Sequence, residues 1–317
     1  MSNDIRIKKG LDIKLIGEAE KTISNAVVSK YYTLRPEDFH SVIPKLVVKV
    51  GSKVKAGETV FFDKNHENVK FVSPVSGEVI DIARGEKRRI LEIKIQADET
   101  QTFQNNGKLN VDTAKAEDIK KHLLSAGCWP FVKQRPYDVI ADQENSPKAI
   151  FVSAYASAPL VADLDFALKG KEAELQAAVS ALGKLTDGNV NVTIGKNSNS
   201  PFSGLSGIIL HKVSGPHPSG NVGTQINKID PINKGEIVWT VSAQDLVIIG
   251  ELLLTGKFNA ERVVAMAGSS ISNPRYFVSK IGSEVATMIY DKGIEKDANV
   301  RIISGNVLSG KQVSPSG

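Results

Sequence analysis

The chain has 317 residues, of which 41% are hydrophobic and 24% charged. This length predicts two or three domains, and the composition excludes an intrinsically disordered protein. The net charge of +5 is spread along the chain, so it gives little support to a nucleic-acid partner. The densest basic cluster, Lys87 to Arg89, is predicted to be a solvated hairpin tip.

Cysteine content and hydropathy indicate a protein of a reducing compartment, for which we expect the cytoplasm. The single cysteine, Cys128, excludes an internal disulfide and a cysteine-ligated iron–sulfur cluster. The most apolar helix candidate, Leu246 to Leu254, is interrupted by Glu251 and reaches only about half of a membrane span. The start, "MSNDIRIKKG", lacks the apolar core of a signal peptide. We therefore expect membrane contact only through a partner.

Residues 1–100 are predicted to form a barrel-sandwich domain. From Lys45 to Ile95, short β-branched runs alternate with Gly, Asn and Lys turns, as in a compact antiparallel β unit. The pattern "VGSKVKAGETV…VSPVSGEV" puts glycines at tight turns and a proline before one of them. This pattern resembles lipoyl and biotinyl carrier domains.

Modified carrier domains present a lysine at an exposed hairpin tip, and the candidate in this chain is Lys64. The tip is lengthened by the polar run "NHEN", and no acyltransferase or carboxylase sequence follows. We therefore predict that Lys64 is an ordinary, unmodified surface lysine.

Residues 101–147 are predicted to be a helical linker followed by a loop. An amphipathic helix is expected in "AKAEDIKKHLLSAG", and "AGCWPFVKQRPY" follows it. Cys128 lacks a partner motif and is predicted to be a small buried residue instead of a nucleophile. The rings of this run pack in the core or between domains, or they present flat faces and cations to a partner or an aromatic ligand. We favour packing.

Residues 148–232 are predicted to form a Rossmann-like α/β domain. The strand candidates "KAIFVSAY", "VNVTI" and "GIILHKV" surround the helix candidate "EAELQAAVSALGKL". A dinucleotide fold would carry G-x-G-x-x-G directly after its first strand, because a pyrophosphate needs bare backbone. This chain has "SAYASAPLVADLD" there, without glycine. We expect neither NAD nor flavin to bind in the usual way.

Two histidines, His211 and His217, flank "KVSGP". This spacing places them on neither one helix face nor one strand face, and no third ligand lies nearby in the sequence, so a zinc site is disfavoured. The loop "GPHPSGNVGTQ" has two open interpretations. It joins two domains, or its backbone and His217 line a ligand pocket.

Residues 233–317 are predicted to form an α+β unit with one helix laid on a sheet. The strand candidate "IVWTV" precedes a capping box at Ser242 and Asp245, and a helix is expected to run from there through Leu254. Strand candidates "RVVAMAG", "RYFVSKIG" and "NVRIISG" follow.

Seven runs occur in the same order as in the NqrA family of the bacterial sodium-translocating NADH:quinone oxidoreductase, which the chain resembles over its whole length. These runs are "IRIKKGLDIKLIG", "VKVGSKVKAGETVFFDK", "FVSPVSGEV", "WPFVKQRPY", "AIFVSAYASAPLVADLDFAL", "GPHPSGNVGTQI" and "LLTGKFNAERVVAMAGSSISNPRYFVSKIG". The resemblance implies a multidomain α/β and β protein whose third domain is an SLBB-type β-grasp. Family members continue beyond "SGKQVSPSG", so we expect that this β-grasp domain is incomplete and that a C-terminal segment is missing.

The resemblance also implies that this chain holds no cofactor. The family's relatives are RnfC of the Rnf electron-transport complex and the flavin subunit of complex I, which bind FMN or NADH through a glycine-rich loop. At the matching place this chain reads "SAGCWPFVKQRPY", and it has no S-G-A-T run for covalent flavin. FMN, FAD, riboflavin and iron–sulfur centres are expected in other subunits.

The implied role is that of a peripheral subunit on the cytoplasmic side of the bacterial inner membrane, docked mainly on the membrane subunit NqrB. Part of the wall around the quinone is expected in "WPFVKQRPY", where Trp129 and Phe131 would stack and Lys133 or Arg135 would donate to a carbonyl oxygen. His217 is a second donor candidate. The alternatives are a pure assembly scaffold and an RnfC-like redox carrier, which would need cysteine clusters.

Overall fold

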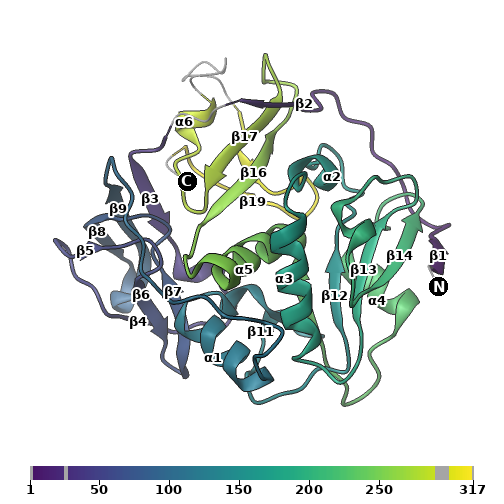
Figure 1. Ribbon diagram of the computed structural model, residues 1–317. Helices are drawn as coiled ribbons and strands as arrows, with labels where there is room; N and C mark the ends of the chain where they lie inside the picture. The colour runs from purple at the N-terminus through teal and green to yellow at the C-terminus, as the bar shows by residue number, and fades with distance from the viewer. Residues whose placement is uncertain (1–2, 25–27, 290–299, 316–317) are drawn as a thin grey trace.

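Three β-rich units surround helix α5 (Ala243–Thr255) in the computed structural model, which describes residues 3–24, 28–289 and 300–315 (Figure 1). The first unit, drawn in blue, lies on one side of α5, and the seven-stranded sheet lies on the other. The third unit, drawn in yellow-green, closes the arrangement above the helix.

The first unit consists of two antiparallel sheets packed face to face. One sheet has the order β3-β9-β8-β5 and the other β4-β6-β7. Apolar side chains alternate along these strands, and the inward ones, such as Val60, Ile93 and Ile95, are fully buried. The strands are β3 (Tyr31–Leu34), β4 (Pro44–Leu46), β5 (Lys53–Val54), β6 (Thr59–Asp63), β7 (His66–Val72), β8 (Gly77–Arg84) and β9 (Ile90–Ala97).

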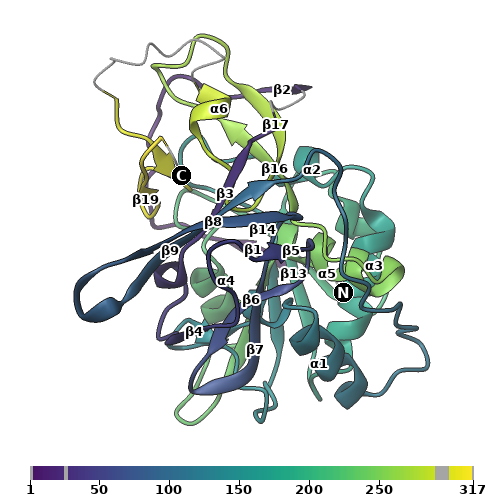
Figure 2. The same cartoon turned by 90° about the vertical axis from the view of Figure 1, so that its left-hand side faces the viewer.

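The β8–β9 hairpin reaches out from this unit and ends in the short helix η2 (Glu86–Arg88) (Figure 2). Lys87, Arg88 and Arg89 are all exposed there. The predicted solvated hairpin tip is therefore confirmed. Another short helix, η1 (Pro36–Asp38), connects β3 to β4.

The second unit is a seven-stranded sheet of order β1-β14-β13-β12-β15-β10-β11. The first five strands run parallel, and β10 and β11 are added antiparallel at one end. The parallel strands read as continuous apolar runs because helices cover both of their faces. The strands are β1 (Asn3–Arg6), β10 (Lys133–Arg135), β11 (Val139–Ile140), β12 (Ile150–Ser153), β13 (Val190–Gly195), β14 (Ile209–Ser214) and β15 (Val238–Ser242).

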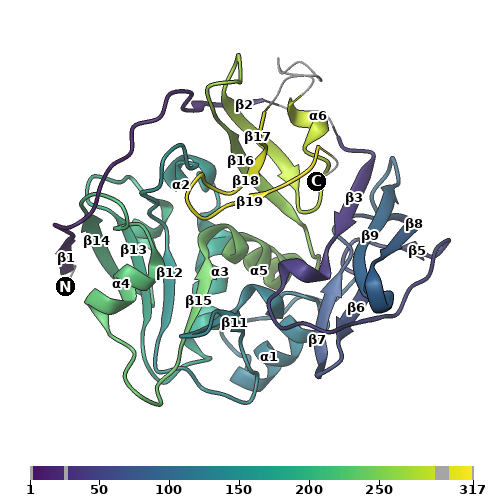
Figure 3. The same cartoon turned by 180° about the vertical axis from the view of Figure 1, so that it is seen from behind.

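Helices cover the two faces of this sheet. Helices α3 (Glu172–Gly183) and α5 lie on the face toward the other units, and α4 (Val222–Ile229) covers the outer face, where Ile226 packs with Phe151 and Val238 (Figure 3). The remaining helices are α1 (Ala116–Ser125), α2 (Leu164–Ala167), α6 (Ala286–Ile289), η3 (Trp129–Phe131) and η4 (Pro201–Gly204).

Helices α3 and α5 cross at Gly250. A Cβ atom at that position would lie 1.9 Å from the carbonyl oxygen of Glu174, so only glycine allows the two backbones to approach this closely. Helix α5 begins where the capping box predicts, since Ser242 Oγ accepts a hydrogen bond of 3.2 Å from the Asp245 N–H.

The sheet extends past the predicted boundary at residue 232. Strand β15 pairs with β12 on one side and β10 on the other, and α5 packs on α3. "IVWTV" and its helix therefore belong to the α/β unit and not to the following one, which corrects that assignment. Because Val238 and Trp239 are fully buried, this strand suits the middle of a parallel sheet, a placement that depends on distant partners.

The N-terminal segment also leaves the unit to which it was assigned. Strand β1 pairs with β14 at the edge of the α/β sheet, and β2 (Glu20–Ser24) pairs with β17 (Arg275–Lys280). The barrel-sandwich itself thus starts at β3. The first residues instead link the second and third units.

The third unit contains the sheet β16-β17-β2, with β16 (Glu261–Met266) antiparallel to β17. Helix α6 and the short pair β18 (Ile303–Ser304) and β19 (Lys311–Gln312) stand beside it. Within the described ranges, no helix combines the length and apolarity needed to cross a bilayer.

Candidate functional site

The run "WPFVKQRPY" forms η3 and β10 at the junction of the three units. Trp129 is fully buried, and its Nε1–H donates to the carbonyl oxygen of Ala141 at 2.7 Å. Its ring meets Trp239 edge-on at a centroid distance of 5.5 Å. The structure therefore makes Trp129 a core residue with its polar atom satisfied.

Phe131 stacks on Phe258, with ring centroids 6.2 Å apart and ring planes 11° from parallel. The guanidinium carbon of Arg262 lies 6.0 Å from the Phe131 centroid, and Arg262 also forms an ion pair with Asp245. The sequence analysis missed Phe258 and Arg262 as partners of this ring. Both lie far away along the chain, and no local motif marks them.

Lys133 is half-buried, and its Nζ lies 5.4 Å from the ring centroid of Phe39, which belongs to the barrel-sandwich. Burial lowers the pKa of Lys133 below its ordinary value, and the carboxylates of Asp138 and Asp245 offset part of that shift. Among the described residues, no carboxylate lies within ion-pair distance of this ammonium group. It remains a donor held against apolar surface.

Arg135 is engaged with its own turn. Its Nε lies 3.2 Å from Asp138 Oδ1, an ion pair in which the N–H does not point along a hydrogen bond. The ring of Tyr137 is 79% exposed. The cluster around Phe131, which we call the junction cluster (Phe39, Phe131, Lys133, Phe258 and Arg262), thus joins residues of all three units.

His217 lies away from the junction cluster. It follows β14, and three strands separate β14 from β10, which corresponds to about 19 Å at the usual strand spacing. Its Nδ1 lies 3.0 Å from Ser157 Oγ, and its backbone N–H donates to Asp12 Oδ1 at 3.1 Å. The structure therefore does not bring His217 together with the other four candidates.

The loop 215–220 lies over the carboxyl ends of β12 and β15, where the strand order reverses. Open α/β sheets bind their ligands at such a switch point. Here Ser153 Oγ lies 3.3 Å from the Gly220 carbonyl oxygen, and Gly220 N–H donates to Ser157 Oγ at 2.7 Å. A Cβ on Gly220 would come within 2.3 Å of the Ser157 nitrogen. The chain's own loop occupies the position that a pyrophosphate would take.

A cleft of about 780 Å³ remains beside this loop, at the carboxyl ends of β12, β13 and β14. Side chains such as Tyr155, Leu160 and Lys196 line it. A glycine-rich phosphate cradle would offer bare backbone N–H groups instead. The residues at this cleft do not fit a dinucleotide or flavin held in the usual way.

The sequence matches three protein-family models. They are the NqrA N-terminal barrel-sandwich hybrid domain over residues 5–98, the NqrA second alpha/beta domain over 114–258, and the NQRA C-terminal domain, an SLBB model, over 263–314. Three relatives are named as this same subunit of the Na(+)-translocating NADH-quinone reductase. They come from Saccharophagus degradans (34% identical, covering 98% of this chain and 69% of the relative), Hahella chejuensis (35%, 97% and 69%) and Pseudomonas aeruginosa (35%, 97% and 68%).

The chain belongs to the NqrA family of Na(+)-translocating NADH-quinone reductase subunits. The predicted resemblance is confirmed, as is the fold class of barrel-sandwich, α/β and SLBB-type domains. The family's second domain spans β10 to α5, in agreement with the sheet and against a boundary at residue 232.

The carrier-like hairpin of this NqrA-family chain has a fixed tip. Lys64 is exposed between β6 and β7, as predicted. The buried Asp63 holds the turn, since its Oδ1 accepts from the N–H groups of Ile43 and Asn65 at 3.1 and 3.2 Å. Whether Lys64 is modified stays a prediction.

Two further residues named from the sequence are buried in this NqrA-family chain. Burial raises the pKa of the Cys128 thiol, and His211 is buried with its Nε2 2.9 Å from Asn191 Oδ1. Across the described ranges, no group of three or more His, Cys, Asp or Glu side chains has the arrangement of a metal site.

Proposed function

We propose that this chain is a cofactor-free peripheral subunit of a sodium-translocating NADH:quinone reductase that docks on the membrane subunit NqrB from the cytoplasmic side. The observation that carries this proposal is the occupied switch point, where loop 215–220 is hydrogen-bonded to Ser153 and Ser157. A chain that fills its own nucleotide crevice serves the complex through contacts and not through electron transfer.

The junction cluster supports a docking role. Phe131, Phe258 and Phe39 bring together the connecting run, the segment after α5 and the barrel-sandwich. Stacked rings and cation–π contacts of this kind contribute beyond the burial of their area. They would hold three domains in one arrangement, which a partner surface needs.

Co-purification with NqrB tests the docking proposal. The full chain, mixed with detergent-solubilised NqrB, is expected to form a stable one-to-one complex, and Phe258→Ala is expected to weaken it by loosening the junction. Tyr137→Ala, which removes an exposed ring, is the matched control. Absence of any complex between the unaltered proteins would contradict the docking proposal.

A second candidate function is contact with the quinone head-group. It is favoured by the Lys133 ammonium group, which lies against Phe39 and has no carboxylate partner among the described residues. Reduction of a quinone develops negative charge on its carbonyl oxygens, which such a donor would stabilise. Trp129 and Phe131 already pack on Trp239 and Phe258, so the donor role is better supported than the stacking role.

Crosslinking separates quinone contact from a pure scaffold. A photoreactive quinone analogue is added to the assembled complex, and labelled peptides from residues 129–137 would support contact. Lys133→Gln is then expected to lower the rate of quinone reduction, with Lys64→Gln as the matched control. Label confined to other subunits, together with an unchanged rate for Lys133→Gln, would leave the scaffold alternative.

A further inference from the structure

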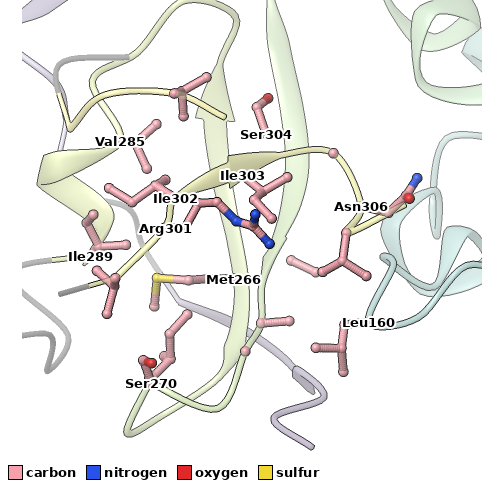
Figure 4. A pocket seen from close by; sticks show the side chains of 18 of the residues that line it. Leu160, Met266, Ser270, Val285, Ile289, Arg301, Ile302, Ile303, Ser304 and Asn306 are labelled. Carbon is pink, nitrogen blue, oxygen red and sulfur yellow. The ribbon is translucent and has the colours of Figure 1, made fainter. Parts of the chain in front are cut away.

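A cavity of about 480 Å³ opens in the third unit, between strand β16, helix α6 and the segment that carries β18 and β19 (Figure 4). Leu160, from the loop between β12 and α2, contributes a wall from the α/β unit. The cavity lies within the usual volume range of small-molecule sites, roughly 300 to 1,000 Å³. It is separate from the junction cluster and from the cleft beside loop 215–220.

The walls of the cavity are mainly apolar. Val264 and Met266 face it from alternate positions on β16, and Ile302 and Val313 line it from the C-terminal segment. All four are only half-buried, whereas the core of the neighbouring units is close to fully buried. Removing this surface from water by filling the cavity would be favourable.

Arg301 is the one charged side chain among the described residues that line the cavity. Figure 4 shows its guanidinium group among the lining side chains, on the same side as Met266. No acidic group of the described residues pairs with it. By contrast, Arg262 is paired with Asp245, and Lys311 Nζ lies 2.8 Å from Asp38 Oδ1.

We propose that this cavity binds an amphipathic anion, a ligand with an acyl chain and a carboxylate or phosphate head. The chain would lie against Val264, Met266 and Ile302, and the head would pair with Arg301. A guanidinium group binds both heads through charge-assisted hydrogen bonds, and the described lining contains no carboxylate that would repel them. This inference is independent of the docking and quinone proposals.

Fluorescence titration with cis-parinarate tests the site on the full 317-residue chain. One saturable site is expected. Arg301→Gln is expected to weaken binding by about tenfold, the effect of losing one charge-assisted contact. Met266→Trp is expected to abolish binding by filling the cavity. Arg84→Gln removes the same charge from the distant β8–β9 hairpin and should leave binding unchanged, and thermal melting checks that each variant is folded.

Competition then identifies the head-group. Displacement of the probe by oleate supports a fatty-acid ligand, and displacement by lysophosphatidic acid alone supports a phospholipid-derived one. The proposal fails if no saturable binding occurs, if binding survives both Arg301→Gln and Met266→Trp, or if methyl oleate competes as well as oleate.

Discussion

Trp129 combines two roles that a single substitution can separate. Its ring fills the core beside Trp239, and its N–H satisfies the buried carbonyl oxygen of Ala141. Trp129→Phe would leave that oxygen without a partner and reduce the packed volume. We expect the free energy of unfolding to fall by about 1 to 3 kcal/mol, as measured by urea denaturation.

The control for this variant is Tyr137→Phe, because the Tyr137 ring is 79% exposed. An exposed substitution of this kind is expected to change stability by no more than about 0.5 kcal/mol. Equal effects of the two substitutions would show that the Trp129 contacts contribute nothing to stability.

His211 should make the chain sensitive to mild acid. Burial lowers the pKa of His211 below its ordinary value, which is about 6.5. The unfolded chain therefore takes up this proton at a higher pH than the folded chain does. The stabilisation present above about pH 6.5 is lost as the pH falls below it, by at most about 1.4 kcal/mol per pH unit for one proton.

Melting temperatures measured from pH 7.5 down to about pH 5 check this expectation. His211→Gln is predicted to flatten the pH dependence, and the exposed His40 gives the control His40→Gln. Identical profiles for His211→Gln and the unaltered chain would contradict the prediction.

The crossing of α3 and α5 makes a prediction at the level of elements. Alanine normally stabilises a helix relative to glycine by roughly 0.5 to 1 kcal/mol. At Gly250 the added Cβ would lie 1.9 Å from the Glu174 carbonyl oxygen, so the helices must move apart. We expect Gly250→Ala to destabilise the chain by about 1 to 3 kcal/mol, as measured by denaturant unfolding.

Gly223 in α4 is the matched control, because no atom lies within 4 Å of the Cβ that Gly223→Ala would add. That substitution is expected to be neutral or slightly stabilising. If Gly250→Ala were to stabilise the chain as Gly223→Ala does, the two helices would not be packed at Gly250.

Local signals predicted the start of individual elements well, and long-range pairing decided what they could not. The capping box at Ser242 marks the start of α5, and the apolar run "IVWTV" marks a strand. Neither signal shows which sheet the strand enters, because β15 pairs with β12 and β10 from earlier in the chain. For the same reason, the departure of β1 and β2 from the barrel-sandwich could not be predicted.

The candidate site shows the same limit. The residue types in "WPFVKQRPY" correctly indicate an aromatic and cationic cluster, but Phe39 and Phe258 come to it from other units. His217 has suitable chemistry, yet the strand order places it at the other end of the sheet. Chemistry could be predicted from the sequence, whereas proximity required the topology.

At the scale of the whole molecule, the central claim is that the chain supports a redox complex without carrying a redox group. Three domains meet at the junction cluster, and the switch point of the α/β sheet is occupied by loop 215–220. The contrast with nucleotide-binding α/β proteins lies at this one edge of the sheet, where side chains and a loop stand in place of bare backbone.

The visible absorption spectrum of the purified full chain, followed by flavin extraction, tests this claim most directly. We predict a colourless protein with no extractable flavin, and an unchanged spectrum after incubation with excess FMN and gel filtration. A yellow preparation with one flavin per chain, retained through gel filtration, would contradict the account.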